Sequence, residues 1–396
     1  MHHTKYCLAL LVMQWSVLDA DSARARPPSS PICTWGIPEP LMQRVEQSVA
    51  TLLVKPISIL SRDKANGFAG ETTFEVLEIL RVTEDEHRVG GTVKYPFETG
   101  TNEDHVYLLI DDPQDKRQWS APLETTDAAV RFINDALLLD TAPPERLRYF
   151  LDFLEDNDEQ VSVEAFYEFA LADYADVRQL QPELSRETLR EWLSDPETKI
   201  DRIGFYSTLL GLTGNEEDAA YLETRIVEQA HNYRLGVDGM VAGYLMLTGE
   251  AGLDIIDRKK LASPDEPLSE TYGVMLALQL MWSYEADRIS KDRLRASMRI
   301  PLDRPDLADL VVTSLARWSD WSVADRLMEM YDEQFDNRGL KRSIVRYYLR
   351  ATTLDSDDKD APPQEVEERC REYLAQLRRK DPEIAEQAER FFFFVK

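Results

Sequence analysis

The chain has 396 residues, of which 43% are hydrophobic and 30% charged, and its 73 acidic and 46 basic residues give a formal net charge of -27. This length exceeds one ordinary core, so we expect two or three domains or one elongated array. The composition is typical of a folded protein. The negative charge disfavours nucleic-acid binding, because that binding requires Lys and Arg to replace counterions, and no basic patch stands out to offset it.

Residues 1–25 have the pattern of a signal peptide. Lys5 gives a short polar start, residues 6–13 are apolar, and Ala23-Arg24-Ala25 places small residues where a signal peptidase reads them. The alternative is a frayed N-terminal helix of a cytosolic protein, which the acidic residues Asp19 and Asp21 favour. The prediction is export to the periplasm or exterior of a bacterium, with no integral membrane span, because no segment supplies the ~20 apolar residues that a bilayer needs.

Cysteine usage leaves the redox state open. Cleavage after Ala25 would remove Cys7 and leave Cys33 and Cys370. Two cysteines allow one disulfide in an oxidising compartment but do not require it, so separate thiols remain the alternative.

A proline-rich tether is predicted at residues 26–40 and a small β domain at 41–123. Residues 72–80 alternate in polarity, with Phe74 and Val76 on one face and Leu77 on the other. Four β-forming runs are separated by Gly, Asn and Asp, and they predict a small antiparallel sheet or barrel: residues 45–60, 72–80, 92–95 and 105–110.

Residues 124–353 are predicted to form HEAT-like helix pairs, beginning with a helix capped by Thr126. The triplet Leu-Thr-Gly occurs at 212–214 and again at 247–249, each time at the end of a helical pattern. We expect a left-handed glycine at both helix ends. A repeat period in the mid-thirties favours an α-solenoid, and an irregular all-α domain is the alternative. An acidic linker follows at 354–363, and a C-terminal helix pair at 364–396.

Several segments resemble a known group of proteins: residues 72–80, 118–123, 164–170, 192–196 and 210–212. On these segments, which span nearly the whole mature chain, the sequence resembles uncharacterised exported bacterial proteins with a small β domain followed by HEAT-like helical repeats. The likeness implies that architecture and no assigned activity. The β domain also resembles the OB-type barrels of netrin-like modules, although Cys33 alone departs from their cysteine framework.

The chemistry-bearing residues form no recognisable catalytic, cofactor or metal motif. His87, His105 and His231 lack the spacing of a metal-ligand pair. The acidic stretches 111–115 and 355–360 depart from a calcium loop and are predicted to be solvated. Trp119 is expected at the junction of the β domain and the first helix, and Trp318 and Trp321 in a helix-packing core.

These observations favour a non-enzymatic interaction or scaffold protein that presents an acidic helical-repeat surface to a protein or peptide partner. The alternative is an exported hydrolase that uses paired carboxylates on a polysaccharide or peptide, which predicts two converging carboxyls with shifted pKa values. A third hypothesis is an envelope component that assembles with itself. The oligomeric state stays open.

Overall fold

A computed structural model describes residues 39–63, 65–83, 87–111, 119–139, 142–228, 234–333, 337–355 and 357–390. Within these ranges, an antiparallel sheet precedes a long series of helices, as the sequence predicts. The strands are β1 (Ala50–Leu60), β2 (Glu71–Val82), β3 (Thr92–Tyr95), β4 (Val106–Ile110) and β5 (Leu123–Thr125). The helix α2 (Leu41–Gln47) comes before the sheet, and α3 (Asp127–Leu137) follows it.

The remaining helices continue to residue 390. The first group is α4 (Glu145–Leu151), α5 (Glu159–Leu171), α6 (Tyr174–Gln179), α7 (Arg186–Ser194), α8 (Ile203–Thr213) and α9 (Glu216–Val227). The second group is α10 (Val237–Thr248), α11 (Glu250–Ile256), α12 (Leu268–Tyr284), α13 (Lys291–Arg299), α14 (Ala308–Arg317) and α15 (Ala324–Glu333). The last three are α16 (Arg338–Thr353), α17 (Gln364–Lys380) and α18 (Pro382–Arg390).

The sheet is open, with the strand order β3-β2-β1-β4-β5. All four neighbouring pairs are antiparallel, and no pairing joins β3 to β5 among the described residues, so the strands form a sheet and not a barrel. Phe74 and Val76 are buried and Leu77 is exposed, which confirms the predicted alternation in β2. The strand β5 was not predicted from the sequence.

The two faces of the sheet pack against different partners. One face forms a separate apolar cluster that contains Leu52, Phe74 and Tyr107. The other face carries Leu53 and Leu108 into the large core shared with the helices. The sheet is therefore joined to the helical part through one face only.

The chain before β1 differs from the prediction. The run at residues 45–60 was expected to be extended from its start, but Val45 lies in α2 and is fully buried. The first strand residue is Ala50. The apolar side chains of α2 satisfy a helical period, and they pack into the helical core rather than extending the sheet.

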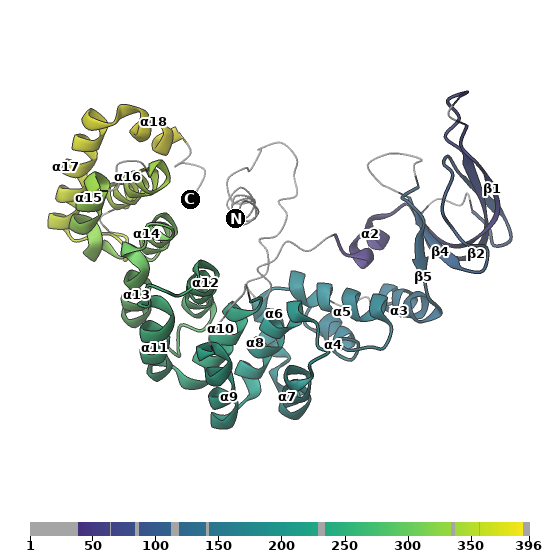
Figure 1. The fold of residues 1–396 in the computed structure, drawn as a ribbon, viewed down its shortest axis with the longest axis horizontal. Helices are drawn as coiled ribbons and strands as arrows, with labels where there is room; N and C mark the ends of the chain where they lie inside the picture. The colour runs from purple at the N-terminus through teal and green to yellow at the C-terminus, as the bar shows by residue number, and fades with distance from the viewer. Residues whose placement is uncertain are drawn as a thin grey trace.

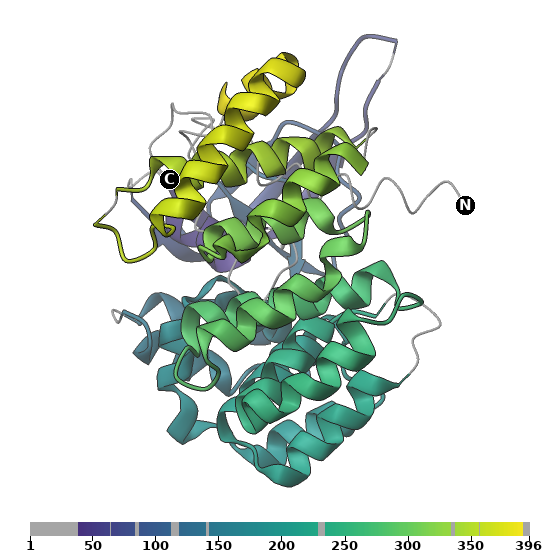
Figure 2. The same cartoon turned by 90° about the vertical axis from the view of Figure 1, so that its left-hand side faces the viewer.

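The helices follow one another along an arc, with the sheet at one end and α16–α18 at the other (Figure 1). The helices α8, α10, α12, α14 and α16 lie along the inner side of this arc, and α7, α9, α11, α13 and α15 along the outer side. Figure 2 looks onto the C-terminal end, where α17 (yellow) lies across the preceding helices. The side chains of Trp282 in α12 and Trp318 continue the contact between neighbouring inner helices, with ring centroids 4.5 Å apart and planes 6° from parallel.

Thr126 caps α3 as predicted, because its hydroxyl accepts a hydrogen bond from the Ala129 N–H at 3.0 Å. The two Leu-Thr-Gly triplets end α8 and α10, but their glycines differ. Gly249 has φ 60° and is left-handed as predicted. Gly214 has φ -75°, so that prediction is wrong there. A Cβ at Gly214 would lie 2.7 Å from the Leu210 carbonyl oxygen, so close approach explains this glycine.

Glycines also bring the backbones of α8 and α10 into contact. A Cβ on Gly239 would overlap the Gly204 carbonyl oxygen, and one on Gly243 would overlap the Ser207 carbonyl oxygen. From the opposite helix, a Cβ on Gly211 would lie 2.5 Å from the Gly243 Cα. Each obstructing atom belongs to the backbone of a helix that is buried over most of its length, so no side-chain rotation could make room. We call this contact the α8–α10 glycine seam.

We expect Gly243→Ala to lower the free energy of unfolding by about 1–3 kcal/mol or more, because the added methyl group must push two buried helices apart. Chemical denaturation followed by circular dichroism measures this change. The matched control is Gly100→Ala, since Gly100 has no atom within 4 Å of an added Cβ. Equal stability of the two variants would contradict the close approach of α8 and α10.

Candidate interaction surface

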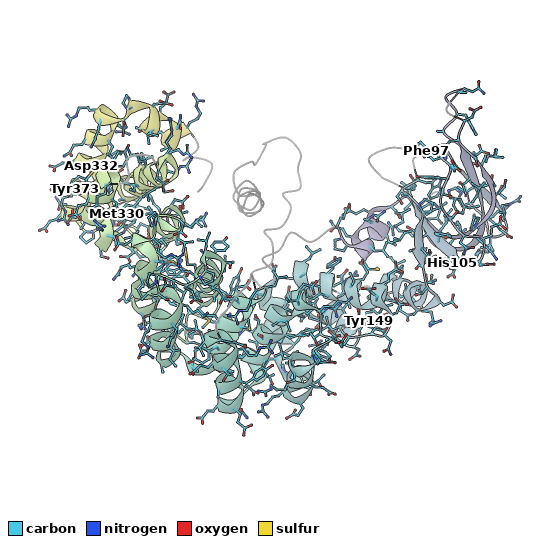
Figure 3. All side chains as sticks on the ribbon, viewed as in Figure 1. Phe97, His105, Tyr149, Met330, Asp332 and Tyr373 are labelled. Carbon is cyan, nitrogen blue, oxygen red and sulfur yellow. The ribbon has the colours of Figure 1, made fainter. Side chains whose placement is uncertain are left out.

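The residues singled out from the sequence lie apart from one another. His105 is on the sheet end of the arc (Figure 3), where its Nδ1 lies 2.9 Å from Oε1 of the exposed Glu124. The His87 ring packs against Trp119 at 5.4 Å between centroids. Trp119 was expected at the junction with the first helix, but it packs against the apolar cluster of the sheet. His231 lies outside the described residues. The described histidines thus do not converge on one site.

The remaining predicted residues have packing roles. Trp318 and Trp321 are buried in the helical core. The acidic stretch that begins at Asp355 is held by the Trp321 indole, whose Nε1–H donates to the Asp360 carbonyl oxygen at 2.9 Å. Cys370 is a buried thiol whose pKa is raised to about 12 by desolvation, while Cys33 lies outside the described residues. In the part of the chain that the structure describes, no three His, Cys, Asp or Glu residues are grouped to hold a metal ion.

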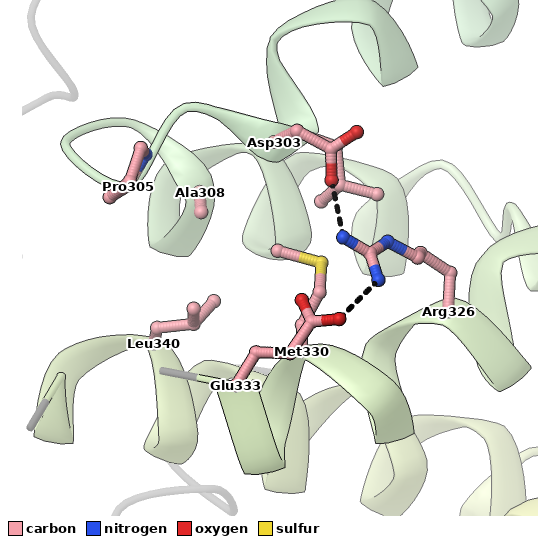
Figure 4. A pocket seen from close by; sticks show the side chains of 8 residues that line it. Asp303, Pro305, Ala308, Arg326, Met330, Glu333 and Leu340 are labelled. Carbon is pink, nitrogen blue, oxygen red and sulfur yellow. Dashed lines mark hydrogen bonds and ion pairs between the residues drawn. The ribbon is translucent and has the colours of Figure 1, made fainter. Parts of the chain in front are cut away.

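A small pocket lies between α14, α15 and α16 (Figure 4). Its volume of about 120 Å³ is below the ~300 Å³ at which ligand sites begin. Arg326 donates to Asp303 at 2.8 Å and to Glu333 at 3.1 Å, so both carboxylates are held by one guanidinium. Hydrogen bonding to these acids, with that to Asp303 the largest cause, raises the pKa of Arg326. This arrangement stabilises the corner between helices.

A second pair of carboxyls lies on α5, one turn apart. Burial raises the pKa of Glu164 to about 7 and also raises that of Glu168. Glu164 accepts hydrogen bonds from the N–H groups of Leu41 at 2.8 Å and Met42 at 3.4 Å, and so caps the N-terminus of α2. Glu168 accepts from Arg146 of α4 at 3.4 Å. Both carboxyls therefore join helices.

The Glu164 pKa makes stability depend on pH. Its pKa in the folded protein, about 7, is higher than its ordinary value of 4.5, so the folded state binds more protons between these values. The free energy of unfolding contributed by Glu164 is therefore fully present below pH ~4.5 and decreases as the pH rises toward ~7. Denaturation of Glu164→Gln at both ends of this range is expected to show a weaker pH dependence than the parent chain. An unchanged slope would contradict the burial of this carboxyl.

The outer helices α7 and α9 and the segment after α7 carry exposed acidic residues. Their basic residues are used in holding the two helices together, because Arg186 and Arg190 of α7 both bind the fully buried Asp218 of α9, at 2.5 Å and 3.1 Å. Arg225 donates to the Leu193 carbonyl oxygen at 3.1 Å. Four of the exposed acids in this region that form no ion pair with any described residue are Glu191, Glu197, Asp201 and Glu216. We call these four residues the outer acidic face.

Charge is distributed unevenly along the helices. Residues 142–228 contain 21 acidic and 8 basic residues, a net charge of -13 within a chain of -27. By contrast, α16 contains Arg338, Lys341, Arg342, Arg346 and Arg350 and no acidic residue. The expectation that no basic patch exists is therefore wrong at this helix. The sequence shows arginines four residues apart in this segment. The large negative net charge of the whole chain, however, gives no sign of a local basic helix.

Comparisons with protein-family models, with curated proteins and with solved structures find no match. Among the described residues, no helix combines the length and the apolar content that crossing a bilayer requires.

Proposed function

We propose that this chain is an exported, non-enzymatic scaffold whose helices form a HEAT-like α-solenoid and whose outer acidic face binds a basic protein or peptide. The observation that carries this proposal is the unequal use of charge in α7 and α9. The arginines are turned inward to the contact between these helices, while Glu191, Glu197, Asp201 and Glu216 face solvent.

The shape of the molecule supports binding to an extended partner. Helices arranged along an arc offer a continuous surface rather than one enclosed pocket (Figure 1). The described pocket is too small for a typical ligand, whereas the outer acidic face spans α7, the following turn and the start of α9. Such a surface attracts basic groups from a distance and provides specificity through charge.

The binding energy is expected to be divided among several weak ion pairs. Each exposed pair contributes about 0.2–1 kcal/mol, so four acids together contribute about 1–4 kcal/mol. These pairs are screened by salt, since the Debye length is about 10 Å at 0.1 M ionic strength. The predicted partner interaction is thus moderate in affinity and sensitive to ionic strength.

The variant Glu191→Gln/Glu197→Gln/Asp201→Asn/Glu216→Gln is expected to bind a fluorescein-labelled Lys-Gly repeat peptide roughly tenfold more weakly than the parent chain. Fluorescence anisotropy at low salt and at about 0.3 M salt measures both the affinity and its screening. Because the four side chains are exposed, the thermal transition should be retained.

The matched control removes four exposed acids elsewhere, in Glu103→Gln/Asp265→Asn/Asp287→Asn/Glu372→Gln. It has the same net charge as the test variant, and it should bind the peptide more tightly than the test variant does. Equal losses in both variants would show that only the total charge matters, and the proposed acidic face would then be rejected. Binding that is insensitive to salt would contradict the proposal as well.

A further inference from the structure

The basic helix α16 presents three of its arginines on one side. With about 100° of rotation per residue, Arg342, Arg346 and Arg350 fall within an arc of roughly 80° on the helix surface. Tyr348 lies on the opposite side, where its hydroxyl donates to the carbonyl oxygen of Ala324 at 2.8 Å. Because Ala324 begins the outer helix α15, the arginines face away from α15. We call the three arginines the α16 arginine row.

The row lies between two other elements. Arg342 and Arg346 reach α18, where they donate to Gln387 Oε1 and to the Ala388 carbonyl oxygen, each at 3.4 Å. On the other side, Arg350 is close enough to Arg317 of α14 for its positive charge to act on that group. The helix α16 contacts α14 and α18 along these flanks. The row is thus the strip of α16 between these two helices, and its three arginines are half-buried there.

The acidic residues near the row either pair with other basic residues or are buried. On α18, Glu383 pairs with Arg338 at 2.6 Å and Glu389 with Arg378 at 2.7 Å, while Glu386 pairs with Arg390 at 3.3 Å. On α14, Asp309 is near Arg342, but its carboxylate accepts the Leu310 N–H at 2.9 Å and burial raises its pKa. No described carboxylate forms an ion pair with Arg342, Arg346 or Arg350.

The positive charges of the α16 arginine row are not balanced by a paired carboxylate among the described residues. Burial and the neighbouring Arg342 lower the pKa of Arg346, and burial and Arg350 lower that of Arg317. In addition, the Arg350 Nε is buried and has no hydrogen-bond partner among the described residues. A buried N–H without an acceptor is destabilising, because the group gives up its hydrogen bond to water and gains none in the protein. An anion bound here would relieve the repulsion among the arginines.

We propose that the α16 arginine row binds an extended acidic peptide in which acidic residues alternate with neutral ones. Residues four apart on a helix are separated by about 6 Å along its axis. Alternate side chains of an extended strand are separated by about 6.6–6.8 Å, so three successive acids meet three successive arginines. The planar guanidinium groups suit carboxylates, because they can donate two parallel hydrogen bonds. This surface is separate from the outer acidic face and recognises the opposite charge.

The test is the binding of a fluorescein-labelled Glu-Gly repeat peptide to the full chain, measured by anisotropy. We expect Arg342→Gln/Arg346→Gln/Arg350→Gln to weaken binding roughly tenfold or more. The control, Arg258→Gln/Lys259→Gln/Arg379→Gln, removes three exposed basic residues elsewhere and should change affinity less than about threefold. Equal weakening in both variants would overturn the proposal, and so would a parent chain that does not bind the peptide.

Two further probes test the chemistry. A peptide of the same length and charge, with its acids in one block, should bind more weakly than the alternating peptide, and equal binding would overturn the match in spacing. An oligodeoxythymidylate of equal charge that binds more tightly than the peptide would overturn the assignment to a peptide. Circular dichroism verifies folding of the triple variant. If it is unfolded, Arg350→Gln and Arg350→Lys replace it, with a greater loss expected for Gln because it removes the charge.

Retained binding of the Lys-Gly peptide by the arginine variants would show that the two surfaces act separately. The affinity for the basic probe tests the outer acidic face, and the affinity for the acidic probe tests the arginine row. Failure of one proposal is therefore distinguishable from failure of the other.

Discussion

The close approach of α8 and α10 is the constraint on which the rest of the arc depends. These helices are buried on nearly all sides, so neither can tilt to relieve a clash without moving its neighbours. Gly204 and Gly239 are 35 residues apart, the same offset as the two Leu-Thr-Gly triplets, so the repeated pattern includes a contact glycine as well as a helix end. The same approach continues into α12, where a Cβ on Gly273 would lie 3.1 Å from Val237. The spacing of the inner helices therefore determines the curvature of the arc, and the outer helices pack against the inner ones.

Ion pairs have a different role from the glycines. They join neighbouring elements through charged side chains and not through backbone contact. Glu270 of α12 is fully buried and pairs with Lys260 at 2.9 Å and with Arg234 at 2.6 Å. Arg202 is also buried, and it donates to the Ser162 carbonyl oxygen of α5 at 3.0 Å and to Glu155 at 3.0 Å. Such pairs cost desolvation and are satisfied only in one arrangement, so they favour one register of helices over others. The arginines consumed in this way are unavailable to neutralise the surface, and the exposed acids are left in excess.

Local pattern predicts the features that depend on neighbours in sequence. The alternation at Phe74 and Val76, and the cap at Thr126, each follow from spacing within one element. Features that depend on distant contacts were missed. The bond from Leu41 to Glu164 spans 123 residues, so nothing near Leu41 signals that its helix is capped from α5. Gly214 was given the wrong conformation because the reason for a glycine there is the nearby Leu210 carbonyl and not a left-handed turn.

The candidate surfaces show why net charge alone is a poor guide to binding. The total of -27 indicates an acidic protein, yet it combines a segment of -13 at residues 142–228 with the wholly basic helix α16. At a Debye length of about 10 Å, charges on α7 and α9 are screened from those on α16, because the two groups lie in different parts of the arc (Figure 1). Under the two proposals, each surface would act on its partner through its own local potential. The helices between them hold the two surfaces apart, which is the property that the proposed scaffold with two unlike partners would require.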